Sequence, residues 1–244
     1  MINYYYDGSF EGLLTSVYEA YYSGEPPNSI VPHKNMQENI FQKNVHIKTD
    51  SEKASKVYKA IYQKISYSAL KNVYHAYLSE LECIDYSIYQ YLKLGFKMGK
   101  SVDLLLSDER VLSIHSASRK VRGESHRMLG LLRFRKLSGE IYYAPYSPDY
   151  NITAMIFPHF VKRLSDQMWV IHDTRRNYAA AYDKNECVLI DLPSEFQYHV
   201  NKGDDHYELL WKKYFKSICI KGRINPRLQK QHMPTRYWKY LVEK

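Results

Sequence analysis

The sequence has few cysteines and no long apolar run, and both absences exclude classes of protein. Its 3 cysteines, Cys83, Cys187 and Cys219, are far apart and show no CxxC spacing. This odd, scattered set argues against a disulfide framework, a Cys-rich zinc site and an iron–sulfur cluster, and it favours a reducing compartment, the cytoplasm. No run reaches the ~18 apolar residues of a membrane span, and the opening segment MINYYYDGSF lacks the pattern of a signal peptide. We expect no membrane partner.

Catalytic and nucleotide-binding motifs are also missing. Gly99-Lys100-Ser101 ends like a P-loop, but that motif needs a glycine where the chain has Leu94. The sequence contains no GxGxxG, HExxH or GxSxG, and no helix-hairpin-helix glycine pattern. The histidines are scattered singly along the sequence, so we expect no metal site.

Tyrosine and positive charge are abundant. The 244 residues include 25 Tyr, and Lys+Arg exceed Asp+Glu by 35 to 26, a formal net charge of +9. A basic, tyrosine-rich chain of otherwise ordinary globular composition indicates a polyanionic partner, most often nucleic acid. The alternative is that tyrosines fill the core and lysines keep the protein soluble.

The positive charge is concentrated in two windows. Residues 110–136 hold 8 basic side chains and one acidic side chain, and residues 207–240 hold 9 and one, whereas residues 1–50 are net acidic. Cations that meet the backbone and flat rings that meet bases are what single-strand or flipped-base binding requires. The aromatic residues that interleave with the second window are Tyr214, Phe215, Tyr237, Trp238 and Tyr240. In the alternative reading these rings face the core.

The apolar periodicity predicts an α+β protein. Residues 1–122 read as a mainly helical N-terminal part, with helices over 10–22, 51–65, 67–81, 85–98 and 107–121. Residues 123–244 read as an α+β part. The alternative to this division is that the whole chain forms one integrated domain. Strands over 128–137, 140–146, 169–172, 178–182 and 187–192 and a helix over 152–164 predict a central antiparallel sheet of ββαββ type. The basic C-terminal helices are expected over 204–220 and 226–242.

Two sets of side chains are candidates for function. An enzyme acting on a nucleobase or phosphodiester would use His126, His159, His172 and Asp173 for acid–base chemistry, although His172 and Asp173, as neighbours on a strand, point to opposite faces. The nucleic-acid-binding candidates are Arg127, Arg133, Arg135, Arg175, Arg176, Lys216, Arg223, Arg227, Arg236, Tyr237 and Trp238.

Several stretches along the whole chain match one bacterial family in the right order. They are Tyr6–Leu14, Asn72–Glu80, Leu94–Lys97, His126–Met128, Arg133–Arg135, Pro158–Phe160, Ile171–Arg176, Tyr214–Ser217, Asn225–Gln229, Met233–Pro234 and Arg236–Trp238. On these residues the chain resembles a family of unknown function that is labelled as a DNA-metabolism or DNA-repair protein. The family is encoded beside a radical-SAM protein, and a similar domain is sometimes fused to a uracil-DNA-glycosylase-like domain.

The resemblance implies an accessory role for this chain. The radical-SAM chemistry, with its iron–sulfur cluster and SAM, would belong to the partner, because this chain lacks a CxxxCxxC ligand set. Glycosylase activity would belong to the fused domain, because neither a GQDPYH-like nor an HPSPL-like element is present. We therefore expect no cofactor in this chain and a nucleic-acid-binding module, with single-stranded or damaged DNA and the radical-SAM protein as partners. The alternatives are the enzyme described above and a protein-interaction subunit that docks the radical-SAM partner.

Overall fold

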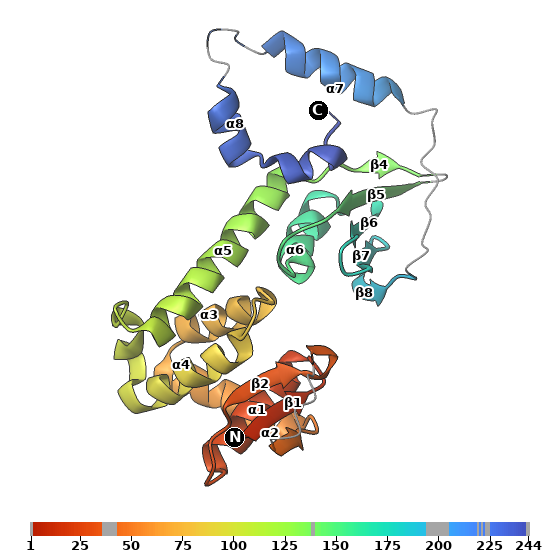
Figure 1. The fold of residues 1–244 in the computed structure, drawn as a ribbon. Coiled ribbons are helices and arrows are strands. Elements are labelled where there is room, and N and C mark those ends of the chain that lie inside the picture. Colours follow the sequence, from red (N-terminus) through yellow and green to blue (C-terminus); the bar gives the residue numbers. More distant parts are fainter. Residues whose placement is uncertain are drawn as a thin grey trace. The chain divides into compact units, whose positions relative to one another are not determined.

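A computed structural model of the protein describes residues 2–35, 43–137, 140–193, 205–218, 220, 222 and 225–242. Its helices and strands are drawn in Figure 1. By their contacts the residues divide into two units, Met1–Arg122 and Gly123–Lys244. Each unit is described by itself below.

The first unit begins with a small parallel sheet. Its strands are β1 (Ile2–Tyr6), β2 (Ser29–Pro32) and β3 (Lys43–His46), in the order β2-β1-β3 with both pairs parallel. Helix α1 (Phe10–Tyr22) forms the crossover from β1 to β2, as a parallel pair requires. The aromatic run of β1 is core, since Tyr4, Tyr5 and Tyr6 are all buried. The prediction of a mainly helical N-terminal part therefore missed a sheet whose outer strands are short.

A tight turn links β1 to α1. Gly8 has a φ of +88°, in the left-handed region that favours glycine, and Ser9 caps the helix by accepting a hydrogen bond from the Gly12 N–H at 2.9 Å. The Asp7 carboxylate accepts hydrogen bonds from the Ser9 N–H at 2.9 Å and from the Thr49 hydroxyl at 2.8 Å. The turn thus ties the end of β1 to the segment that follows β3.

We expect Gly12→Ala to destabilise the first unit by about 1–3 kcal/mol, because the site is overpacked. A Cβ atom there would lie 2.3 Å from Asp7 Oδ1 and 2.9 Å from both Tyr6 Cδ2 and Thr49 Oγ1. Gly130→Ala is the control, because a Cβ atom in that helix meets nothing within 4 Å, and it should stabilise by about 0.5–1 kcal/mol. Thermal melts of both variants test whether Gly12→Ala lowers stability while Gly130→Ala raises it. A G12A variant with unchanged stability would contradict the prediction.

Helices make up the rest of the first unit. They are α2 (Ser51–Ala60), the π-helical turn η2 (Ile61–Ile65), α3 (Tyr67–Leu78), α4 (Ile84–Met98), the 3-10 helix η3 (Gly99–Leu104) and the first part of α5 (Glu109–Leu131). Ile61, Ile65, Val73 and Ile88 are fully buried in their shared core. Asp50, not Ser51, caps α2, since its carboxylate accepts the Glu52 and Lys53 N–H groups.

Two tyrosines of this helical part are exposed. Tyr58 and Tyr62 lie at helical core spacing, yet 47% and 56% of their surface is accessible. The buried stripe of α2 consists of Ala54 and Val57.

The second unit contains a five-stranded sheet. Its strands are β4 (Arg135–Lys136), β5 (Ile141–Tyr146), β6 (Met168–Asp173), β7 (Tyr178–Tyr182) and β8 (Cys187–Asp191), paired in that order. The β5–β6 pair is parallel and the other three pairs are antiparallel. The expected antiparallel sheet is therefore mixed, because helix α6 (Thr153–Arg163) between β5 and β6 returns the chain to the same end of the sheet.

Aromatic side chains fill the space between α6 and the sheet. Tyr142, Trp169 and Tyr182 are register partners on neighbouring strands, so their side chains share one face. Phe160 of α6 packs edge-on against Trp169 with ring centroids 6.5 Å apart, and Phe134 does so at 6.2 Å. Trp169 is fully buried. Helix α6 therefore covers this face of the sheet.

The prediction of a strand over 128–137 is wrong for residues 128–134. Helix α5 continues to Leu131, and β4 comprises only Arg135–Lys136. Met128 and Leu132 are both buried, and their spacing of four residues is that of a helix. The strand was predicted because Arg133 and Arg135 are spaced by two residues, which is the period of a strand.

The described residues of the C-terminal segment include three helical elements. These are α7 (Asp205–Ile218), α8 (Pro226–His232) and the 3-10 helix η6 (Thr235–Tyr240). A single helix over 226–242 was expected, but Pro234 lacks the N–H group that a continuing helix needs, so α8 ends before it. No helix in the described part of the chain is both long and apolar enough to cross a membrane.

Candidate functional site

The loops that follow β5 and β6 hold several of the predicted site residues. Because β5 and β6 are parallel, both loops leave the same edge of the sheet, which is where α/β proteins commonly place their sites. We call this group the carboxyl-end cluster. Its members are Glu124, Asp149, Asp173, Arg175, Arg176, Arg236 and Tyr237.

Asp173 is buried at the end of β6 and organises the turn after it. Its Oδ1 accepts hydrogen bonds from the N–H groups of Arg175 at 2.9 Å and Arg176 at 3.2 Å, and its Oδ2 pairs with Arg176 Nη1 at 2.9 Å. Burial raises the pKa of Asp173, and the neighbouring Arg176 guanidinium partly offsets that effect. The Asp173 carboxylate therefore stabilises the turn that follows β6.

Glu124 is buried near the end of α5 and holds the loop after β5. Its carboxylate accepts hydrogen bonds from the N–H groups of Asp149 and Tyr150, both at 2.8 Å, and from the Tyr237 hydroxyl. One glutamate therefore joins three segments that are far apart in the sequence: α5, the β5–α6 loop and η6.

The arginines of the cluster bind the same loop. Arg175 Nη1 and Arg176 Nη2 donate to the Asp149 carbonyl oxygen at 2.7 and 3.1 Å, and Arg236 pairs with the Asp149 carboxylate at 2.6 Å. Tyr237 is 2% exposed, so its ring is not presented to a base. These contacts make the cluster a structural clamp on the loop.

The structure places the predicted acid–base residues in different environments. His172 is buried on β6 and shares a hydrogen bond of 2.5 Å with the Tyr143 hydroxyl, and burial lowers the pKa of His172 and so favours the neutral imidazole. His126 on α5 and His159 on α6 are exposed. No group of three or more His, Cys, Asp and Glu side chains suited to a metal ion occurs within the described ranges.

Helix α7 carries both exposed cations and exposed rings. Trp211 and Tyr214 are 40% and 54% exposed, with ring centroids 5.7 Å apart, and the guanidinium carbon of Arg133 lies 5.7 Å from the Trp211 ring centroid. We call Trp211, Tyr214 and the exposed lysines Lys212, Lys213 and Lys216 the α7 platform. Sequence reasoning singled out Lys216 but missed Trp211, although Trp211 lies three residues before Tyr214 in the basic window.

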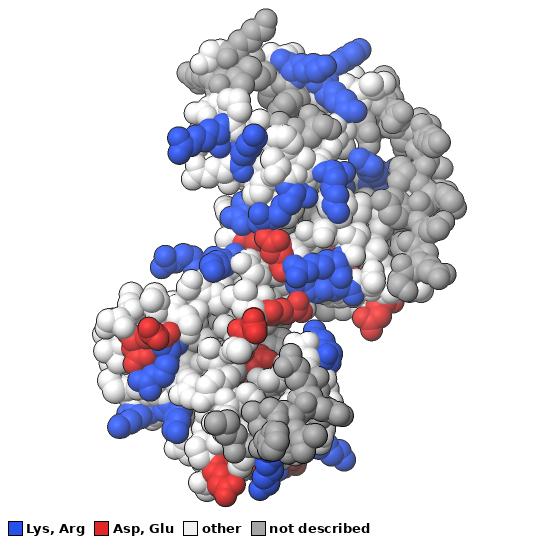
Figure 2. Space-filling view, viewed as in Figure 1, with Lys and Arg blue, Asp and Glu red and all other residues white. Residues whose placement is uncertain are grey.

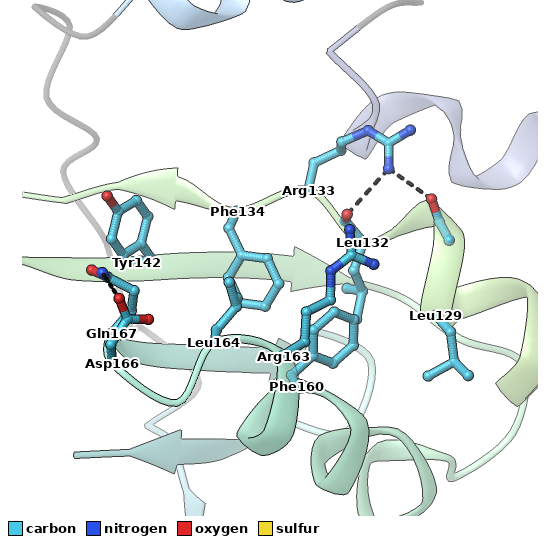
Figure 3. Close-up of a pocket in the computed structure, with 11 residues that line it drawn as sticks. Leu129, Leu132, Arg133, Phe134, Tyr142, Phe160, Arg163, Leu164, Asp166 and Gln167 are labelled. Carbon is cyan, nitrogen blue, oxygen red and sulfur yellow. Dashed lines mark hydrogen bonds between the residues drawn. The ribbon is translucent and has the colours of Figure 1, made fainter. Parts of the chain in front are cut away.

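A cavity of about 480 Å³ opens between α5, β5 and α6 (Figure 3). Its lining residues are Leu129, Gly130, Leu132, Arg133, Phe134, Tyr142, Phe160, Arg163, Leu164, Asp166 and Gln167. Arg133 Nη1 donates to the carbonyl oxygens of Gly130 at 2.8 Å and Leu132 at 3.2 Å, which fixes the side chain at the rim. Of this lining, only Arg133 was predicted, because the other residues look like ordinary core or helix-end residues in the sequence.

The remaining predicted cations are spread over the second unit. Arg127 is half-buried on α5, and its Nε has no hydrogen-bond partner among the described residues. Arg135 lies on β4 and Arg227 is exposed on α8. Trp238 donates from Nε1 to the Met233 carbonyl oxygen at 2.8 Å, and Arg223 lies outside the described residues. Lys and Arg side chains recur across the face of this unit that Figure 2 shows.

The fold and these contacts define the second unit as a mixed α/β domain with a basic surface and an aromatic-lined cavity. A family model described as a domain of unknown function, DUF4130, matches residues 83–243, and the chain belongs to that family. The match spans the second unit together with α4 and all of α5. No curated protein matches the chain.

Proposed function

We propose that the protein is a nucleic-acid-binding accessory module of DNA metabolism or repair, which holds single-stranded or damaged DNA while a partner performs the chemistry. The α7 platform is the observation that carries this proposal, since it presents three lysines and two accessible rings on one short helix. Stacking of a base on an aromatic ring contributes about 1–3 kcal/mol and tolerates any sequence, while lysines follow the phosphate backbone.

The proposed partners follow from the family resemblance and from this chain's chemistry. A radical-SAM protein would supply the iron–sulfur cluster and SAM, and a uracil-DNA-glycosylase-like domain would supply base excision where the two are fused. Both would act in the cytoplasm. Two of this chain's own cysteines, Cys83 in the first unit and Cys187 on β8, carry free thiols.

The enzymatic alternative has less support. Of its four side chains, His126 and His159 stand on helix surfaces, and Asp173 is occupied by the turn that it organises. We therefore favour binding over catalysis for this chain.

Binding of a fluorescent single-stranded oligonucleotide over a salt series tests the proposal. Each phosphate contact contributes about −0.7 to the slope of log affinity against log salt for single strands. We therefore expect the triple substitution Lys212→Gln, Lys213→Gln and Lys216→Gln to make the slope shallower by about 2. Trp211→Ala should weaken binding about tenfold through lost stacking.

A matched triple substitution in the first unit is the control. Lys56, Lys59 and Lys64 are also exposed lysines on helical elements, and changing them to glutamine removes the same charge. That variant should leave the slope unchanged. A salt slope near zero for the unaltered protein, or equal effects of the two triple variants, would refute the proposed function.

A further inference from the structure

The geometry points to the cavity as a binding site for one nucleotide unit, with its base between the aromatic side chains and its phosphate at the two arginines. The inference rests on the proposed function, since it assigns to this cavity one nucleotide of the bound strand. The ligand chemistry is a flat base joined to an anion, whether in a strand or free.

The cavity has the size and lining of a small-molecule site. Its volume of about 480 Å³ lies within the roughly 300–1,000 Å³ range of such sites. Phe134, Tyr142 and Phe160 contribute rings, and the Phe134 and Phe160 rings stand edge to face with centroids 5.2 Å apart. The buried Trp169 packs behind both of them, so these rings are held in place. A rigid aromatic wall suits a planar base better than a flexible chain.

Charge is separated along the cavity. In Figure 3, Arg133 and Arg163 lie toward one end, whereas Tyr142, Asp166 and Gln167 lie toward the other, with the Phe134 ring between them. Arg163 is exposed, and no carboxylate of the described chain forms an ion pair with it. Two guanidiniums at one end suit a phosphate, because their N–H groups match its oxygens.

The opposite end offers groups that can read a base. The Gln167 side chain donates to the Asp166 carboxylate at 3.1 Å, and the Tyr142 ring lies near both of them in Figure 3. An amide, a carboxylate and a phenol together provide both donors and acceptors for the edge of a base. Along the cavity, the arginines would therefore meet the phosphate, the aromatic rings would meet the flat face of the base, and the polar groups would meet its edge.

The cavity also adjoins the α7 platform. Arg133 lines the cavity and at the same time lies over the Trp211 ring of α7. A strand with a base stacked on Trp211 or Tyr214 would therefore lie beside Arg133, and one of its nucleotides would be next to the opening. The two features form one path, in which the platform holds the strand and the cavity takes a single base.

Calorimetric titration with deoxynucleoside monophosphates, and with base-free deoxyribose 5-phosphate, tests the inference. We expect the nucleotides to bind more tightly than the base-free ligand. Arg163→Gln should weaken every phosphate-bearing ligand about fivefold or more, because it removes one charge-assisted contact. Lys162→Gln is the matched control, since it removes a neighbouring exposed cation of α6 that does not line the cavity, and it should change affinity less than twofold.

A second variant separates the base from the phosphate. Phe134→Leu keeps an apolar side chain but removes the ring, so it should weaken nucleotides about tenfold and leave deoxyribose 5-phosphate unchanged. For a nucleotide within a strand, a single-stranded oligonucleotide with one 2-aminopurine should change its fluorescence when it binds the protein. The F134L variant should abolish that change. Circular dichroism of each variant confirms that it is folded.

The outcomes distinguish this inference from the proposed function. If strands bind with the expected salt slope while R163Q and K162Q behave alike and nucleotides bind no better than the base-free ligand, the inference is wrong and the proposed function stands. If strands do not bind but nucleotides bind in a manner that depends on Arg163 and Phe134, the proposed function is wrong and the cavity takes a free nucleotide.

Discussion

Replacing Glu124 with alanine should lower the free energy of unfolding of the second unit by about 3–5 kcal/mol, as expected when one partner of a buried polar network is removed. Glu124 is 0% exposed and accepts from two loop N–H groups and the Tyr237 hydroxyl. Without the carboxylate, the buried Tyr237 hydroxyl and the two partly buried N–H groups lose their acceptor.

The substitution should also loosen the loop that the arginines hold. Arg175, Arg176 and Arg236 all bind Asp149, whose own N–H group is anchored by Glu124. Glu124→Gln keeps the size of the side chain but turns an NH2 group toward donors, so it should cost somewhat less than alanine. The β5–α6 loop and η6 should show faster amide hydrogen exchange in both variants.

Urea unfolding followed by tryptophan fluorescence measures this effect, because all 3 tryptophans, Trp169, Trp211 and Trp238, belong to the second unit. Glu140→Ala, which removes an exposed glutamate of the same unit, is the control and should change stability by less than about 0.5 kcal/mol. If E124A unfolds like E140A, the clamp does not stabilise the unit.

The pH dependence of the first unit should be nearly flat between pH 4 and 6.5 and should become steep when either the partly buried His75 or the buried Asp85 is removed. Burial, helped by the charges of Arg122 and Lys71, lowers the pKa of His75 from 6.5 to about 4. Burial raises the pKa of Asp85 from 3.8 to about 6, against the opposing effects of a Tyr6 hydrogen bond and the Lys34 charge. The two shifts cover almost the same pH range.

Their signs oppose each other. Between pH 4 and 6.5 the unfolded chain binds a proton at His75 that the folded chain does not, so the stability contributed by neutral His75 is complete above pH 6.5 and is lost as the pH falls toward its folded pKa. Between pH 3.8 and 6 the folded chain keeps a proton on Asp85 that the unfolded chain has released, so stability falls as the pH rises toward the folded pKa of Asp85.

Single variants should reveal the two slopes. In Asp85→Asn only the His75 effect remains, so the free energy of unfolding of the first unit should rise by about 3 kcal/mol from pH 4 to 6.5. In His75→Gln only the Asp85 effect remains, so the same free energy should fall by a similar amount from pH 4 to 6. Urea unfolding followed by far-ultraviolet circular dichroism, with tryptophan fluorescence identifying the second unit's transition, measures both slopes. Slopes of the same sign in the two variants would contradict this account.

Local signals in the sequence predict the helices well. The N-terminal boundary of α1 follows from Ser9 as a cap after the Asp7-Gly8 turn, and its C-terminal boundary follows from Gly24 and the prolines beyond it. Strand β7 was likewise predicted over its full length at 178–182. These features depend on residues that are neighbours in the chain, which is why their patterns are visible without the fold.

Long-range contacts account for most of what the sequence did not predict. The direction of the β5–β6 pair depends on how α6 crosses the sheet, and the role of Glu124 depends on Tyr237, which is more than a hundred residues away. The cavity likewise depends on Phe134, Phe160 and Arg163 meeting across three elements. Each of these side chains looks unremarkable in its local sequence, and only the fold gives it a neighbour.

The central position of β1 has a consequence for the order in which the first unit forms. Strand β1 is made before β3, yet its pairing on that side is complete only when Lys43–His46 has been made, because β3 supplies the partners. Helices α3 and α4 depend on local contacts and can form early, whereas the sheet depends on pairs distant in sequence, whose loop-closure entropy slows them. Strand β1 is made before β2 and β3, and it is therefore among the last parts of the first unit to be fixed in place.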